Sequence, residues 1–253
     1  MKKYYLVIII FSVIAFSNLS VALPNSITIV KGGNEYAPYD INLGNGKFTG
    51  IYVDVVYQVA EQLNIKVNFE VYPWARCFIM MKKGMADAFI APYINKERSE
   101  YMYFSKEPLA YEENVLMTYK GSQVQFSGDV SALMNLEVAA LIGASYGEKW
   151  DSVNFSNKHL LPSLESLVMK LAKKRVEVII GTRYVIQHIA NKNSITNDIV
   201  ALDPPLSVNG GYIAFSKAKG LSHKALSDAF SKALISLKKT TKYQAILKKY
   251  LSE

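Results

Sequence analysis

The sequence predicts an α/β protein built from two lobes, each with a parallel sheet flanked by helices. Apolar, strand-like runs alternate with helical patterns in the first half of the chain, which is typical of a βαβ architecture. The same alternation returns after a polar segment at residues 121–131, which we interpret as a crossing into a second lobe. Two such lobes imply a cleft between them, and clefts of this kind commonly bind small molecules.

The first 22 residues have the pattern of a secretory signal peptide. Lys2 and Lys3 precede an apolar stretch at residues 4–16, and the small residues Ser20-Val21-Ala22 suit cleavage after Ala22. The apolar stretch is shorter than the roughly 20 residues that a membrane span needs. We therefore expect a soluble, exported protein located in the periplasm.

Composition argues against several classes of function. Cys77 is the only cysteine, so no internal disulfide can form. The formal net charge is +8, and the basic residues are scattered, which argues against nucleic-acid binding. The sequence has no Walker loop, dinucleotide fingerprint, paired metal-ligand motif or Gly-x-Ser-x-Gly elbow. We expect neither a cofactor nor a bound metal.

The first elements follow from the spacing of their apolar residues. Residues 27–30 form a short apolar run typical of a strand, and a turn-rich loop with two tyrosines follows at residues 32–39. Residues 52–63 place apolar side chains at helical spacing. Residues 65–71 alternate apolar and polar side chains, as a strand does, until Pro73.

The segment around Arg98 is the strongest candidate for ligand binding in this half. A helix at residues 75–83 ends at Gly84, and a buried strand follows at residues 87–91. Asn95 can cap the next helix and so hold the Arg98 guanidinium in its first turn, beside the end of that strand. A guanidinium offers paired N–H donors that match a carboxylate. The alternative is a solvated surface arginine with a structural ion pair.

The second half follows the same patterns. Residues 114–119 are extended, and residues 136–142 form a buried strand that residues 143–147 turn into a helix. Free N–H groups at such a helix start form a generic anion site, although many similar turns bind nothing. The remaining predicted elements are a helix at 163–174, a strand at 176–180, a turn at Gly181 and Thr182, a helix at 183–191, a strand at 212–215, and helices at 221–237 and 243–250.

Acid–base chemistry in the cleft is a further possibility. Glu35, Asp87 and Glu177 are carboxylates near the predicted cleft, yet each also fits as a strand-end or capping residue. The three histidines lie on unrelated segments, and we assign none of them a catalytic role.

Several motifs, in this order and spacing, resemble the bacterial extracellular solute-binding proteins of family 3, the periplasmic receptors of ABC importers. The resemblance spans the whole chain after the signal peptide. It is carried by Tyr36-Ala37-Pro38-Tyr39, by Gly46-Lys47-Phe48-Thr49-Gly50 with Asp54, by Gly84 with Asp87-Ala88, by Glu97-Arg98 with Phe104-Ser105, and by Tyr243-x-x-Ile246-Leu247-x-x-Tyr250.

The resemblance implies a two-lobed periplasmic-binding-protein fold of type 2. Each lobe is then a mainly parallel sheet flanked by helices, and two hinge strands join the lobes. Lobe 1 is expected at residues 23–113 and 209–253, and lobe 2 at residues 114–208.

The resemblance also implies which residues bind the ligand. Tyr36 and Trp74 match the aromatic residues that pack on it. Arg98 matches the arginine that holds a ligand carboxylate, and Ser145 matches a hydroxyl residue that binds the same group. The full predicted set is Tyr36, Trp74, Tyr93, Arg98, Gly143, Ser145, Tyr146 and Thr182.

Two positions depart from the amino-acid receptors of this family. Ser or Thr usually precedes the arginine where this chain has Ala91, and an Asp for the α-amino group is usual where this chain has Thr182. A neutral hydroxyl does not pair with an ammonium as a carboxylate does. The identity of the solute is therefore open. Arg76 and Arg183 lie close in sequence to pocket positions, so a more anionic solute is an alternative.

We therefore expect a periplasmic receptor, not an enzyme, that captures a small polar solute between closing lobes. The expected solute is an amino acid or a related carboxylate, and the expected partner is the membrane permease of an ABC importer, bound transiently by a monomer. Two alternatives are an enzyme on the same fold, because related two-lobed proteins include dehydratases, and a periplasmic sensor protein.

Overall fold

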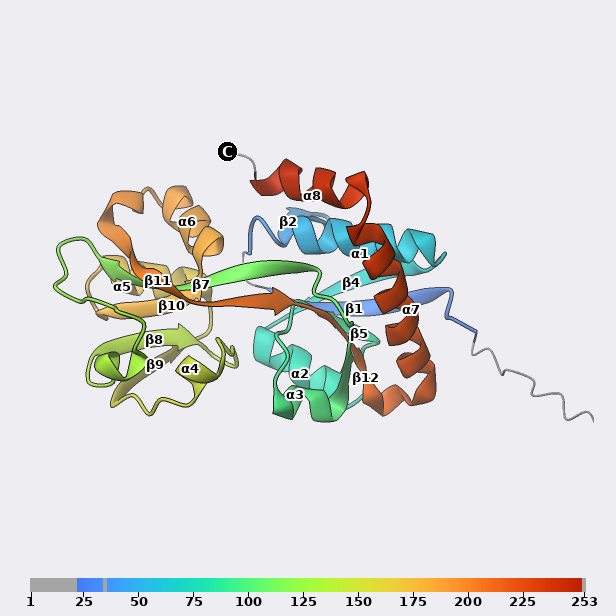
Figure 1. The fold of residues 1–253 in the computed structure, drawn as a ribbon, viewed down its shortest axis with the longest axis horizontal. Coiled ribbons are helices and arrows are strands. Elements are labelled where there is room, and N and C mark those ends of the chain that lie inside the picture. The colour runs from blue at the N-terminus through green and yellow to red at the C-terminus, as the bar shows by residue number, and fades with distance from the viewer. Residues whose placement is uncertain (1–21, 34–35, 252–253) are drawn as a thin grey trace, which may run out of the picture.

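The computed structural model describes residues 22–33 and 36–251. They form two bodies side by side, each built on its own five-stranded sheet, which we call lobe 1 and lobe 2 (Figure 1). The predicted signal peptide lies outside the described residues, apart from Ala22. None of the described helices combines the length and the apolar character that a membrane crossing requires.

Each sheet is assembled from strands that are distant in sequence. In spatial order, lobe 1 has β4 (Lys66–Tyr72), β1 (Ser26–Gly32), β5 (Ala88–Ile90), β12 (Ile213–Ser216) and β6 (Met102–Phe104), with a separate hairpin of β2 (Ile41–Gly44) and β3 (Lys47–Thr49). Lobe 2 has β11 (Ile199–Gly211), β7 (Ala110–Tyr119), β10 (Val178–Thr182), β8 (Glu137–Leu141) and β9 (Asn157–Leu161).

The helices flank these sheets. They are α1 (Ile51–Gln62), α2 (Trp74–Lys82), α3 (Lys96–Tyr101), α7 (Leu221–Lys238) and α8 (Thr241–Leu251) in lobe 1, and α4 (Glu148–Asp151), α5 (Leu164–Ala172) and α6 (Arg183–Lys192) in lobe 2. Short 3₁₀ turns are η1 (Val130–Leu133), η2 (Thr196–Asp198) and η3 (Lys217–Lys219).

Both sheets are mixed rather than mainly parallel. The βαβ units give the parallel pairs β1–β4 and β1–β5 in lobe 1, and β8–β10 and β8–β9 in lobe 2. The chain crosses between the lobes along β7 and β11, and these strands and the returning β12 pair antiparallel with their neighbours. The predicted two-lobed α/β class is confirmed, with antiparallel strands at the crossing.

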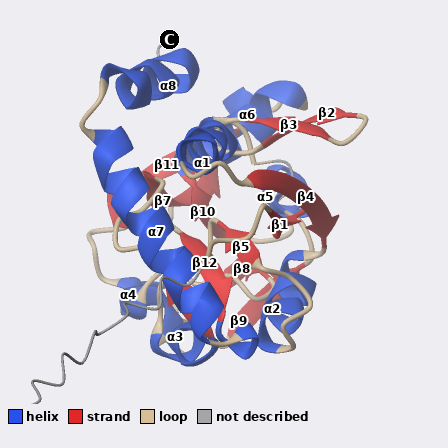
Figure 2. Cartoon of the chain, turned by 90° about the vertical axis from the view of Figure 1, so that its right-hand side faces the viewer, coloured by secondary structure: helices blue, strands red, loops and turns tan. Residues whose placement is uncertain are grey.

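Both faces of the central strands β1 and β5 of lobe 1 are buried, which agrees with their short apolar runs. Ile27 and Ile29 of β1 pack into a core with α1 and α7, whereas Val30 faces a second core with α2. Figure 2 shows α1 and α7 on one side of the sheet and α2 on the other. The side chains of a strand alternate between faces, so both positions must be apolar.

The structure differs from the local predictions in two places. Gly181 and Thr182 belong to β10, because they pair with β7, and do not form a turn. Residues 143–147 lead from β8 into α4 as predicted, although this helix begins at Glu148 and spans only four residues. The edge strand β9 was not predicted, because its mostly polar or exposed residues carry little apolar signal.

The strands β7 and β11 are the two connections between the lobes in Figure 1. They pair antiparallel from Ala110 with Gly211 to Tyr119 with Ile199. Their register shifts between Leu202 and Ser207, where two prolines lack the N–H donors of a regular ladder. The predicted lobe boundaries fall inside these two strands and stay a prediction.

The carboxyl-terminal helix α8 returns to lobe 1. The Tyr250 hydroxyl donates to the Asp54 carboxylate at 2.7 Å and accepts from the Gly50 N–H at 3.1 Å. Gly50 has φ of 113°, and a Cβ there would lie 2.5 Å from the backbone oxygen of Tyr39, so only glycine fits. Two motifs that are far apart in sequence thus form one contact.

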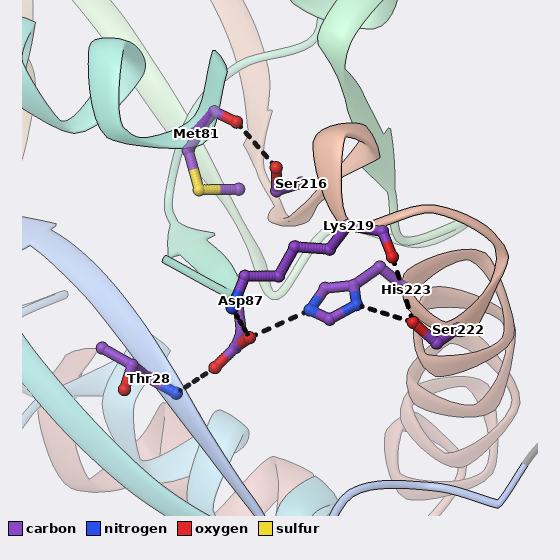
Figure 3. A network of polar contacts seen from close by, with 7 residues as sticks. All are labelled: Thr28, Met81, Asp87, Ser216, Lys219, Ser222 and His223. Atoms are coloured by element: carbon purple, nitrogen blue, oxygen red, sulfur yellow. Dashed lines mark hydrogen bonds and ion pairs between the residues drawn. The ribbon is translucent and has the colours of Figure 1, made fainter. Parts of the chain in front are cut away.

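A polar network holds the start of β5 against β1 and the start of α7 (Figure 3). The Asp87 carboxylate accepts from the Thr28 N–H at 2.7 Å, from Lys219 Nζ at 2.5 Å and from His223 Nε2 at 3.0 Å. These donors lower the pKa of Asp87 below its ordinary value, although burial acts in the opposite direction. The predicted Asp87 carboxylate therefore has a structural role in lobe 1.

We expect Asp87→Asn to lower the free energy of unfolding by about 1 to 2 kcal/mol at pH 7, because the Lys219 cation and the His223 ring lose their shared carboxylate acceptor. The folded-state pKa of Asp87 is depressed, so this stabilisation is complete at neutral pH and is lost as the pH falls below about 4. Urea unfolding of both proteins at pH 7 and at low pH measures the difference.

The matched control is Asp228→Asn, which removes an exposed carboxylate paired with Lys224 on α7. It should cost no more than about 0.5 kcal/mol. Equal losses from both substitutions, or a difference that persists at low pH, would contradict the role of Asp87.

Candidate ligand-binding site

A cavity lies between the two lobes, with about 700 Å³ of empty space including the solvent at its mouth. In lobe 1 it is lined by the end of β1 and its following loop, by α2, by β5 and by α3; in lobe 2 it is lined by β8 and its following loop, by α5 and by β10. All the predicted ligand residues line it except Gly143, which contributes a backbone oxygen beside it. Their roles in binding stay predictions.

Arg98 is held at the cavity by its own helix start. The Asn95 side chain accepts the Arg98 N–H at 2.8 Å, as the predicted cap does. The guanidinium donates to the backbone oxygens of Tyr93 at 2.9 Å and Gly143 at 3.0 Å, and it lies 4.4 Å from the Phe78 ring centre. These contacts tie lobe 1 to lobe 2 through one side chain.

The Arg98 guanidinium is buried, and no carboxylate within the described residues pairs with it. The residue is 5% exposed, and burial lowers its pKa. No acidic side chain among the described residues lies within ion-pair distance of it; its hydrogen-bond acceptors are backbone oxygens. The described part of the chain therefore forms no surface ion pair with Arg98, and the charge faces a cavity that a carboxylate can enter.

Trp74 forms an aromatic wall of the cavity at the start of α2. Its ring lies 4.7 Å from Phe89 and 5.4 Å from Phe78 between centres, and its Nε1 donates to the Gly143 oxygen at 3.3 Å. A Cβ at Gly32 would lie 3.0 Å from the indole, so glycine at the end of β1 makes room for it. The lobe 1 core thus packs against the Trp74 ring and supports it.

The loop that contains Ser145 already surrounds a carboxylate of the chain itself. The Ser145 hydroxyl donates to Asp151, and the Tyr146 N–H donates to the same carboxylate at 3.1 Å. The predicted anion donors of this loop are therefore used within lobe 2. The Tyr146 hydroxyl accepts the Leu141 N–H at 3.3 Å.

Sequence reasoning missed Glu112, which lies on β7 behind the cavity. The residue is 1% exposed, and hydroxyl groups from both lobes surround its carboxylate. They belong to Tyr36 at 2.5 Å, Tyr93 at 2.5 Å, Thr182 at 2.8 Å and Tyr52. Strand alternation was the available signal, since Glu112 shares its face with the buried Ala110 and Asn114.

A second buried carboxylate, Asp40, also lines the cavity. It pairs with Lys31 at 3.0 Å, and Lys31 also lies 4.6 Å from the Phe48 ring centre. Burial raises the pKa of Asp40, and the Lys31 cation opposes this shift. The two charges of this pair compensate each other.

The other sequence candidates that the structure describes do not line the cavity. Arg183 pairs with Glu113 and with Asp203, and Arg76 stacks 5.2 Å from the Tyr72 ring centre, so neither supports an anionic solute. Glu177 accepts the Glu137 N–H, Glu35 lies outside the described residues, and Asp87 belongs to the network of Figure 3. The described residues contain no group of three acidic, His or Cys side chains placed to hold a metal ion.

Comparisons with known proteins agree with this architecture. The model of the bacterial extracellular solute-binding proteins, family 3, matches residues 29–253. The "Probable histidine-binding protein" of Neisseria gonorrhoeae is 24% identical over 244 residues, which cover 92% of this chain and 85% of that protein.

Solved structures match across almost the whole chain. A histidine kinase sensor domain with similarity to periplasmic binding proteins has a TM-score of 0.79 at 21% identity, covering 89% of this chain and 96% of that one. The substrate binding protein of an amino acid ABC transporter has a TM-score of 0.75 at 18% identity, covering 90% and 100%. Likeness at this identity establishes the two-lobed fold.

Proposed function

Because the chain belongs to the bacterial extracellular solute-binding proteins of family 3, we propose that it captures an amino acid between its lobes in the periplasm and delivers it to an ABC importer. The observation that carries this proposal is the buried Arg98 guanidinium, which lines the cavity and whose acceptors among the described residues are backbone oxygens. A ligand carboxylate supplies the charge that the described residues do not. The relative in Neisseria gonorrhoeae, named for histidine binding, favours an amino acid.

Closure follows from contacts that span the lobes. Arg98 of lobe 1 reaches the Gly143 oxygen, and the Tyr36 hydroxyl lies 2.9 Å from that of Thr182 in lobe 2. A ligand held by both walls binds the closed form more tightly than the open form, so it shifts the population toward closure. The importer then reads the closed form.

The first test is a thermal-shift screen of residues 23–253 against the common amino acids, dicarboxylates, polyamines and small sugars. A ligand of the folded state adds about 2.7 kcal/mol of stability at one hundred times its dissociation constant. We expect at least one amino acid to raise the melting temperature and to be recovered chemically unchanged, as mass spectrometry will verify. A shift only with sugars, no shift at all, or conversion of the ligand would overturn the proposal.

A sensor is the second candidate, and the likeness to a histidine kinase sensor domain favours it. The two functions differ in which partner protein binds the closed form. Membrane vesicles from the source cells should take up the radiolabelled ligand in an ATP-dependent manner when the purified protein is added. Uptake that is independent of the protein would favour the sensor.

A further inference from the structure

Glu112 is a buried carboxyl group with which no cation of the described residues pairs. Among the described residues its hydrogen-bond partners are the hydroxyls of three tyrosines and of Thr182, all of them neutral groups. Buried carboxylates are normally paired with a cation, because loss of hydration strongly disfavours an isolated charge. Three of these hydroxyl residues, Tyr36, Tyr93 and Thr182, also line the cavity, so the Glu112 carboxyl group is separated from the cavity by one hydroxyl.

The hydroxyl groups that donate to Glu112 keep lone pairs that can accept a hydrogen bond from another group. Tyr36 Oη, Thr182 Oγ1 and Glu112 Oε2 form a triangle with sides of 2.5, 2.8 and 2.9 Å. Each hydroxyl has one hydrogen, and an ionised carboxylate has none. When both hydroxyls donate to Glu112, their own lone pairs remain as acceptors, and a nearby anion makes such hydroxyls stronger acceptors. An N–H donor that carries positive charge satisfies them best.

We propose that Glu112 selects solutes that carry a positively charged nitrogen. The N–H groups of that nitrogen donate to the hydroxyls of Tyr36 and Thr182, which in turn donate to Glu112. This inference rests on the proposed function, in which Arg98 binds the carboxylate of the same solute. Tyr93 links the two charges, because its backbone oxygen accepts from Arg98 at 2.9 Å and its hydroxyl donates to Glu112 at 2.5 Å. One tyrosine therefore contacts both the Arg98 guanidinium and the Glu112 carboxyl group.

The other carboxylates near the cavity already have partners in the chain. Asp40 pairs with Lys31 through Oδ2, while its Oδ1 has no hydrogen-bond partner among the described residues, and Asp151 accepts from Ser145 and Tyr146. Burial raises the pKa of Glu112, and the surrounding hydroxyl donors oppose that shift. A ligand cation acts in the same direction as the hydroxyls, since an opposite charge favours the ionised form.

The test compares wild type with Glu112→Gln by isothermal titration. The probes are L-glutamine, L-histidine and L-arginine, the carboxylates glutaramate and glutarate, and the amines histamine and agmatine. We expect wild type to bind at least one amino acid about 100-fold more tightly than either carboxylate. Glu112→Gln should reduce this preference by at least about tenfold through weaker amino-acid binding, with carboxylate affinity within about threefold of wild type.

Two further variants guard against a merely structural effect. Glu113→Gln removes the same charge one residue along β7, where the side chain pairs with Arg183 outside the cavity, and should leave the preference unchanged. Thr182→Val keeps the Glu112 charge but removes an acceptor at nearly constant volume, and should lower the preference at least about fivefold. This variant decides the matter if Glu112→Gln does not fold.

The remaining outcomes distinguish the role of Glu112 from the proposed receptor function. Equal weakening of amino acids and carboxylates in Glu112→Gln, or carboxylates bound by wild type as tightly as amino acids, overturns the role of Glu112 and leaves the receptor standing. Wild type that binds only the amines supports Glu112 and overturns the carboxylate role of Arg98. Wild type that binds no probe overturns both.

Discussion

Arg98→Ala is expected to weaken amino-acid binding by about 100-fold or more, because the ligand carboxylate then enters the cavity without its charged partner. The loss should appear mainly as faster dissociation, since the contact forms inside the closed cleft. Arg98→Lys keeps the charge but lacks the fork that reaches Tyr93 and Gly143 together, so we expect an intermediate affinity. Titration calorimetry and stopped-flow fluorescence measure both quantities.

The matched control is Arg76→Ala, which removes an exposed arginine from α2 in the same lobe. Its affinity should stay within about threefold of wild type, because exposed charges away from the ligand contribute little. Small-angle scattering should show that ligand compacts the control but not Arg98→Ala, which loses the contact to lobe 2. Ligand binding by Arg98→Ala as tight as that of the control would contradict the assignment.

Local patterns predicted most of the fold because the interactions that decide where helices and strands form join residues that are close in sequence. The apolar spacing of residues 52–63 predicted α1, and the alternation of residues 65–71 predicted β4. Asn95 was correctly predicted as a cap because a helix start is decided within three residues. The same cap places Arg98, three residues after Asn95, beside the end of the predicted strand.

The polar contacts of the site could not be predicted in the same way. The four hydroxyls around Glu112 come from positions 36, 52, 93 and 182, and no local pattern relates them. Ser145 was expected to present its hydroxyl to a ligand, yet Asp151 reaches it from the other end of a very short helix. Neither pairing has a signal until the chain is folded.

The structure further implies that the site depends on a side chain it does not expose. Phe89 of β5 is fully buried, with its ring 4.7 Å from Trp74 and 5.0 Å from Phe78. Phe78 in turn lies under the Arg98 guanidinium. Phe89 therefore supports both the aromatic wall and the charged group of the cavity.

We expect Phe89→Ala to lower the free energy of unfolding by about 3 to 5 kcal/mol, because it leaves a large cavity in a close-packed core. It should also weaken ligand binding about tenfold, since small displacements of Trp74 and Arg98 disturb a preorganised site. Urea unfolding gives the first value, and titration at a temperature where circular dichroism shows a folded protein gives the second.

Phe69→Ala is the control that separates stability from support of the site. Phe69 lies on β4 and packs against Phe48 and Tyr57, away from the cavity, and it is only partly buried. Its removal should cost less stability than that of Phe89 and leave the affinity unchanged, because neither Trp74 nor Phe78 rests on it. If Phe69→Ala weakened binding as much as Phe89→Ala, the affinity would depend on the stability of lobe 1 as a whole. A selective loss in Phe89→Ala would instead locate the dependence in the packing beneath Trp74 and Arg98.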